Sequence, residues 1–207
     1  QFESVFINCA ESEWPGVEKL LGEVEKSAGL TRGDLQFFNH RTNDVWVRDY
    51  GPIYLRHTQS GALALTDWDY NGWGEKYPYK LDNLIPSVIE NASGLPCFNQ
   101  LLVLEGGSIE TNGVGDILVT RDCLLNSNRN PKYTSEEISQ VLRVALGVEK
   151  IHWLDGCIEG DDTDGHIDNL VRFFKPNGVL MATTDHSDVE NYEMLAHLNR
   201  QCSELET

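Results

Sequence analysis

Residues 161–169 read Asp161-Asp162-Thr163-Asp164-Gly165-His166-Ile167-Asp168-Asn169, and this acidic stretch is the most informative one in the chain. If Gly165 begins a strand, His166 and Asp168 lie on one face, because side chains alternate along a strand. An imidazole beside a carboxylate can carry out acid–base chemistry on a bound cation. The stretch therefore predicts a functional site at a strand end, with a plain acidic loop as the alternative.

Metal binding is a second alternative for this stretch. An EF-hand calcium loop fails on spacing, because taking Gly165 as its sixth position puts Gly160 and Val171 where acidic ligands are required. A His-x-Asp pair can also ligate a transition metal, but no second histidine-rich motif in the sequence completes a ligand set. We therefore expect no metal and no organic cofactor.

A second motif lies upstream and reads Glu105-Gly106-Gly107-Ser108-Ile109-Glu110-Thr111-Asn112-Gly113. Two glycines after a strand allow the backbone to approach another group closely, or allow a bulge. The Asn112-Gly113 pair is typical of a hairpin turn. The stretch has no Gly-x-Gly-x-x-Gly or Walker pattern, so phosphate binding is not supported. An ordinary glycine-bearing hairpin is the alternative reading.

The third motif reads Trp46-Val47-Arg48-Asp49-Tyr50-Gly51-Pro52. It sets a charged pair between an apolar strand and a Gly-Pro turn. Functional sites are commonly built at such positions. A structural salt bridge beside a turn is the alternative.

The spacing of apolar residues predicts an α/β protein in which strands and helices alternate about three times. Thr134 with Glu137, and Ser187 with Glu190, have the pattern of a helix capping box. Pro86 predicts a kink or a helix start. Strands are expected at residues 5–8, 45–47, 53–56, 62–66, 101–105, 117–120, 150–154, 170–174 and 179–183, and helices at 17–28, 81–89, 135–146 and 188–204.

Charge and cysteine content narrow the class of partner. The chain has 207 residues, 33 of them acidic and 16 basic, for a formal net charge of −17. Nucleic acids and anionic membranes select for Lys and Arg, so we expect neither as a partner. The five cysteines show no Cys-x-x-Cys spacing, which favours reduced thiols and a cytoplasmic location.

Taken in order, these motifs resemble the agmatine deiminase family, which is similar to the bacterial peptidylarginine deiminases. The resemblance implies a pentein α/β propeller of five ββαβ units, of which this chain looks like about three. It also implies that residues 1–207 form a single catalytic domain, incomplete at both ends relative to the family. The matching segments are Trp46 to Pro52, Asp67 with Tyr70 to Gly74, Glu105 to Asn112, and Gly165 to Phe173.

The same resemblance implies roles for four residues. Asp49 and Asp168 hold the two sides of a substrate guanidinium, His166 moves protons, and Glu105 supports the site. Trp46 could stack on the cation. We expect the four titratable groups to converge on one polar cleft. The implied reaction hydrolyses agmatine to N-carbamoylputrescine and ammonia through a thiouronium formed on a cysteine, within putrescine biosynthesis.

The implied nucleophile is a cysteine in a late Gly-Gly-Gly-x-x-His-Cys motif, and none of the five cysteines here has that context. We therefore expect the 207-residue chain by itself to be inactive. The alternatives are a peptidylarginine deiminase-like enzyme, an amidinotransferase, and an inactive guanidinium-binding fragment. A homo-oligomer also stays open.

Overall fold

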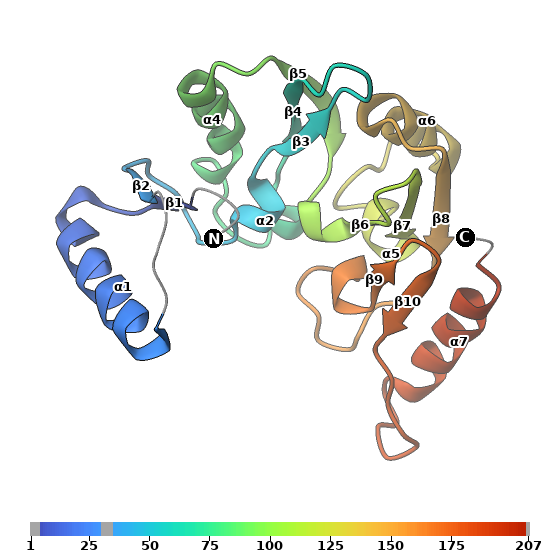
Figure 1. Ribbon diagram of the computed structural model, residues 1–207. Coiled ribbons are helices and arrows are strands. Elements are labelled where there is room, and N and C mark those ends of the chain that lie inside the picture. Colours follow the sequence, from blue (N-terminus) through green and yellow to red (C-terminus); the bar gives the residue numbers. More distant parts are fainter. Residues whose placement is uncertain (1–4, 30–34, 206–207) are drawn as a thin grey trace. The chain divides into compact units, whose positions relative to one another are not determined.

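A computed structural model describes residues 5–29 and 35–205 (Figure 1). The chain divides into two compact units, a small one at Gln1–Asn43 and a large one at Asp44–Thr207. Among the described residues, none of the helices has both the length and the apolar character needed to cross a membrane.

The small unit is a strand, helix, strand motif. Its two strands pair in parallel, and the ring of Trp14 stacks on Phe37 with 5.5 Å between centroids. Gly29 ends the helix in the left-handed conformation, at φ 63°. The predicted strand at 5–8 is confirmed, and the helix begins three residues earlier than predicted. The elements are β1 (Val5–Asn8), η1 (Glu11–Glu13), α1 (Trp14–Ala28) and β2 (Leu35–Phe38).

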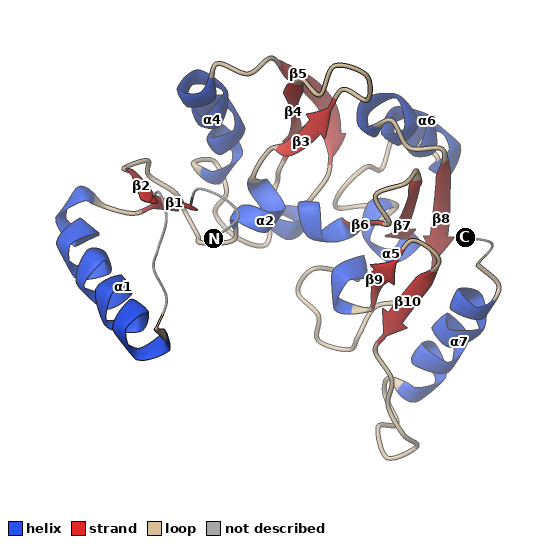
Figure 2. Cartoon of the chain, viewed as in Figure 1, coloured by secondary structure: helices blue, strands red, loops and turns tan. Residues whose placement is uncertain are grey.

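The large unit repeats one pattern of strands and helices (Figure 2). In the first two repeats an antiparallel hairpin is followed by a helix, and a third strand then pairs in parallel with the second. A third repeat supplies an antiparallel hairpin and a helix. The repeats are β3 (Ile53–Arg56), β4 (Leu63–Asp69), α4 (Ile85–Ser93) and β5 (Cys97–Val103); β6 (Ile109–Thr111), β7 (Asp116–Thr120), α6 (Ser135–Leu146) and β8 (Lys150–Leu154); and β9 (Val171–Lys175), β10 (Gly178–Met181) and α7 (Tyr192–Ser203).

A short helical turn precedes each of the three hairpins. These turns are α2 (Val47–Tyr50), η3 (Gly106–Ser108) and η4 (Ile167–Asn169). The remaining short elements are α3 (Gly72–Glu75), η2 (Asp82–Leu84) and α5 (Arg121–Leu124). We call these three turns the entry turns, and each of the three motifs identified in the sequence contains one of them.

The core of the second repeat forms between β7 and α6. Ile117, Val119, Ile138 and Leu142 are almost completely buried. The predicted capping box begins this helix: the side chain of Thr134 accepts from the Glu137 amide, and the Glu137 carboxylate accepts from the Thr134 amide. Such a cap satisfies two amides that would otherwise have no partner within the helix.

The predicted strand at 45–47 is wrong. The Asp44 carboxylate accepts a hydrogen bond from the Val45 amide, and the Asp49 amide donates to the Trp46 carbonyl. These local bonds turn the chain into α2. A three-residue apolar run is too short to outweigh them.

Gly165 does not begin a strand, whereas the strand predicted at 170–174 is present as β9, shifted by one residue. Gly165 lies at φ 95°, His166 caps η4, and β9 begins only at Val171. The Asp161 carboxylate accepts from the amides of Thr163 and Gly165, which coils the chain. His166 and Asp168 therefore do not share the face of a strand.

The predicted Ser187–Glu190 capping box does not form. The Ser187 hydroxyl donates to Asp185 instead, and α7 begins at Tyr192. Val189, which lies within the helix predicted at 188–204, precedes α7 and is exposed. The predicted strand at 101–105 starts earlier, at Cys97, and leaves Glu105 just beyond its end. The Pro86 helix start and the 112–113 hairpin turn are confirmed.

Candidate active site

Three of the predicted site residues meet inside the large unit. Asp49 comes from α2, while Glu105 and His166 cap η3 and η4. His166 Nδ1 lies 3.7 Å from Asp49 Oδ1, and His166 Nε2 lies 3.9 Å from Glu105 Oε2. The imidazole thus sits between two carboxylates, and all three residues are buried.

The glycines of the second motif make this approach possible. A Cβ on Gly107 would collide with His166 Nδ1 and would lie 2.8 Å from Asp49 Oδ1. A Cβ on Gly106 would collide with the Arg48 carbonyl. The prediction that these glycines allow close backbone approach is confirmed, and the groups they approach belong to the two other entry turns.

Asp49 is held by two donors. The Trp73 indole donates to Oδ2 and the Gly107 amide to Oδ1, each at 3.0 Å. Burial raises the pKa of Asp49, although the facing His166 and the two donors oppose that rise. A carboxylate oxygen accepts about two hydrogen bonds, so both oxygens keep acceptor capacity for a bound cation.

Glu105 is completely buried and has a completely buried partner. Arg129 Nε donates to Glu105 Oε1 at 2.6 Å, and neither side chain is exposed. Burial opposes ionisation of Glu105. His166 and Arg129 outweigh that effect and lower its pKa. Glu105 is therefore an ionised acid in the interior, which is stable only where a cation is paired with it.

His166 gains proton affinity from the acids around it. Burial by itself would lower the pKa of His166, but Glu105, Asp49 and Asp168 together raise it. Its Nε2 atom is buried and has no hydrogen-bond partner among the residues described. The imidazolium is favoured, as a group that donates a proton requires.

Asp168 lies at the edge of this cluster, where its charge contributes to the raised pKa of His166. The Asp168 side chain is 20% exposed, and its Oδ2 lies 4.0 Å from Arg48 Nε. A guanidinium of the protein itself thus already stands beside Asp168. Trp46 caps α2 and is 56% exposed.

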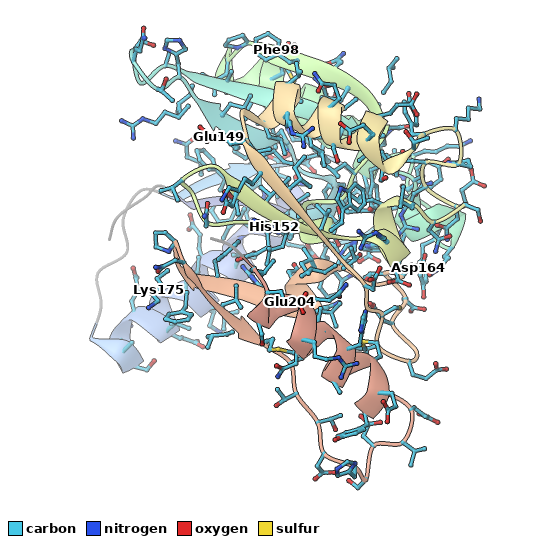
Figure 3. All side chains as sticks on the ribbon, turned by 90° about the vertical axis from the view of Figure 1, so that its right-hand side faces the viewer. Phe98, Glu149, His152, Asp164, Lys175 and Glu204 are labelled. Carbon is cyan, nitrogen blue, oxygen red and sulfur yellow. The ribbon has the colours of Figure 1, made fainter. Side chains whose placement is uncertain are left out.

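The loop that carries His166 is tied to two other segments. Asp164, at φ 61°, receives Lys76 Nζ at 2.7 Å on one oxygen and Arg129 Nη1 at 3.0 Å on the other. Tyr77 donates its hydroxyl hydrogen to the Asp162 carboxylate. Figure 3 labels Asp164 in the loop between β8 and β9. These contacts fix the backbone that presents His166.

Sequence reasoning assigned no role to Trp73, Arg129 or Asp164. It assigned no role to Cys123 either, whose Sγ lies 3.9 Å from Glu105 Oε2. A buried carboxylate requires a cationic partner, so the prediction of Glu105 could have prompted a search for one. Nothing in the sequence marks Arg129 in particular, which lies 24 residues away in the chain.

The sequence matches the Porphyromonas-type peptidyl-arginine deiminase family over residues 1–207. The chain belongs to this family. It is 39% identical over 171 residues to the agmatine deiminase of Pseudomonas syringae pv. tomato, an alignment that covers 80% of this chain and 46% of that protein. The chain spans about half the length of the curated relatives it matches.

Solved structures of family members share the fold. The agmatine deiminase of Enterococcus faecalis superposes with a TM-score of 0.81 at 28% identity, covering 95% of this chain and 52% of that one. The C. jejuni agmatine deiminase with substrate bound gives 0.81 at 29% identity, covering 98% and 68%. The predicted pentein α/β fold is confirmed by this similarity.

Proposed function

We propose that the protein is an agmatine deiminase, which hydrolyses the guanidinium of agmatine to N-carbamoylputrescine and ammonia. The observation that carries this proposal is the buried meeting of Asp49, Glu105 and His166, with Asp168 at its edge. Family membership and the relatives named as agmatine deiminases support the choice of substrate.

The acids of the cluster suit a guanidinium substrate. That group stays protonated, because its pKa is above about 12. Asp49 and Asp168 bind its N–H groups from two sides by charge-assisted hydrogen bonds, and so fix its plane. Arg48 Nε stands 4.0 Å from Asp168 Oδ2, so this carboxylate already faces one guanidinium of the protein itself. The exposed ring of Trp46 is available to stack on the bound cation.

His166 handles the protons of the reaction. A thiolate attacks the central carbon of the guanidinium, and the bond to one nitrogen breaks. His166 donates its proton to that nitrogen, which leaves as ammonia. It then takes a proton from the water that attacks the thiouronium, so that the ureido product forms and the thiol is released. Glu105 keeps the imidazole oriented and favours its protonated form between these steps.

The cysteines of the large unit do not suit the nucleophilic step. Burial raises the pKa of Cys123 well above its usual value and that of Cys157 to about 11, and it also raises the pKa of Cys97 and Cys202. A thiolate at neutral pH requires a lowered pKa. The proposal therefore gives these four thiols no nucleophilic role.

The test compares substrates and one matched pair of variants. The native protein should release ammonia and N-carbamoylputrescine from agmatine without any added amine, and should leave a peptidyl-arginine substrate unchanged. Asp168→Asn should lose most turnover, because one charged hydrogen bond contributes roughly 1.5–3 kcal/mol to binding alone. Asp185→Asn, at an exposed carboxylate, is the control. Wild-type turnover in Asp168→Asn would remove that residue from the site, and a requirement for an amine would indicate an amidinotransferase.

A role in putrescine biosynthesis and a cytoplasmic location follow from the same proposal. The product would be one hydrolytic step from putrescine. The five cysteines lack disulfide spacing, which suits a reducing compartment. The acidic net charge of −17 fits a small cationic substrate and disfavours nucleic acid as a partner.

A further inference from the structure

Three atoms that could ligate a metal lie close together on the Nε2 side of the His166 ring. They are Glu105 Oε2, Cys123 Sγ and His166 Nε2, which all lie within 4.8 Å of one another, and all three residues are buried. The mechanism gives Cys123 no task. His166 Nε2 has no hydrogen-bond partner among the described residues, although it is buried and directed toward this cluster.

The spacing of the three donor atoms allows a metal ion to lie between them. The Cys123 thiol donates a hydrogen bond to Glu105 Oε2 at 3.9 Å, whereas His166 Nε2, also 3.9 Å from Oε2, is well beyond the usual length of an N–H···O bond. An ion at the centre of this triangle would lie no more than about 2.5 Å from each atom, close to the bond lengths of Zn²⁺ to S, N and O ligands. Side-chain movements of a few tenths of an ångström would complete the fit.

The surrounding charges also suit a divalent ion. Arg129 binds the other Glu105 oxygen, Oε1, so Glu105 can use Oε2 for a metal while the Arg129 contact persists. Arg129 is itself balanced by Asp164. A thiolate and a carboxylate then neutralise the two charges of the ion. A mixed set of S, N and O donors is typical of Zn²⁺, and outer contacts such as Arg129–Glu105 orient the ligands.

We propose that Glu105, Cys123 and His166 form an inhibitory site for a thiophilic divalent cation of the Zn²⁺ class. Binding releases two protons to solvent, one from the Cys123 thiol, which becomes a metal-bound thiolate, and one from Nε2 of the His166 imidazolium, which becomes a neutral ligand. The ion occupies the Nε2 lone pair of His166 and one Glu105 oxygen. Because these are the groups that the proposed function uses for proton transfer, the inference of inhibition rests on that function. The ion would thus switch the reaction off.

The experiment uses chelator-treated native protein titrated with ZnCl₂, with agmatine turnover as the first readout. Wild type should lose activity as zinc is added and recover it when EDTA is added. Cys123→Ala should keep its zinc-free turnover, and should require at least about tenfold more zinc for half-inhibition. Cys157→Ala is the matched control, because it removes a half-buried thiol outside the cluster and should respond like wild type.

A second readout is independent of activity. Co²⁺ should give a thiolate-to-metal charge-transfer absorption in wild type and in Cys157→Ala, and not in Cys123→Ala. Cys123→Ser takes the place of Cys123→Ala if the alanine variant does not fold. Equal zinc sensitivity in wild type and the Cys123 variant, or an unchanged cobalt spectrum, would overturn the site. A protein that binds cobalt through Cys123 but does not hydrolyse agmatine would refute the proposed function and leave the metal site standing.

Discussion

Replacing Arg129 by Met should be among the most destabilising single changes in the large unit. The Arg129 side chain is completely buried and forms ion pairs with Glu105 at 2.6 Å and with Asp164 at 3.0 Å. Met fills a similar volume but removes the cation that is hydrogen-bonded to the buried Glu105 carboxylate. Removal of one partner from a buried pair costs about 3–5 kcal/mol.

A second background separates the cost of leaving Glu105 unpaired from the cost of poorer packing at position 129. In a Glu105→Gln background no buried charge is left without its partner, so the same Arg129→Met change should cost about 2 kcal/mol less. The four proteins form a double-mutant cycle. Arg129→Lys should fall between wild type and Arg129→Met, because it keeps the charge but not the forked geometry that reaches both acids.

Urea denaturation followed by tryptophan fluorescence measures these differences. With an m-value of roughly 2–3 kcal/mol/M, the midpoint of Arg129→Met should fall by about 1–2.5 M. A loss of stability below about 1 kcal/mol would refute the reasoning. So would strict additivity of the two single changes, because it would mean that Arg129 and Glu105 are not energetically coupled.

The other predictions concern backbone approach, helix capping and proton affinity. Gly107→Ala should lower kcat by more than about tenfold, because the new methyl group would press on His166. Gly22→Ala is the control and should leave kcat unchanged, because Gly22 has open space around it. An equal kcat in both variants would contradict the close approach at Gly107. Thr134→Ala should lower the free energy of unfolding by about 1 kcal/mol, and an unchanged thermal midpoint would argue against the cap. Glu105→Gln should move the His166 titration, followed by NMR, to lower pH, because it removes a carboxylate that raises this pKa. In wild type the protonated His166 stabilises the fold below about pH 6.5, and this contribution is lost as the pH rises through the raised native pKa. A His166 titration that is unchanged in Glu105→Gln would refute the claim that Glu105 raises this pKa.

Features set by neighbouring residues could be predicted from the sequence. The Thr134–Glu137 box joins groups three residues apart, and the apolar spacing after it fixes the buried face of α6. The same rule failed at Ser187, because a nearby competitor, Asp185, takes its hydroxyl. A capping pattern shows that a bond can form, and the surrounding chain decides which bond does form.

Features set by distant residues could not be predicted. The loop before His166 is held through Asp164 by Lys76 and Arg129, which lie 88 and 35 residues away in the chain. The partner of Glu105 comes from a polar segment with no motif of its own. The choice of Asp49, Glu105, His166 and Asp168 was possible because three ordered motifs resembled one family, and single motifs left the structural alternatives open.

The entry turns have a consequence for how this protein can change over time. Asp49, Glu105 and His166 stand in or directly before the turn that leads into the first hairpin strand of three successive repeats. Different residues therefore serve the reaction and the fold. The turns hold the reactive groups, and the hairpins and helices hold the apolar ones. Duplication of an inert repeat could have supplied a reactive position at the same place each time. A later substitution in one turn could then alter the reaction while the packing of that repeat is inherited intact.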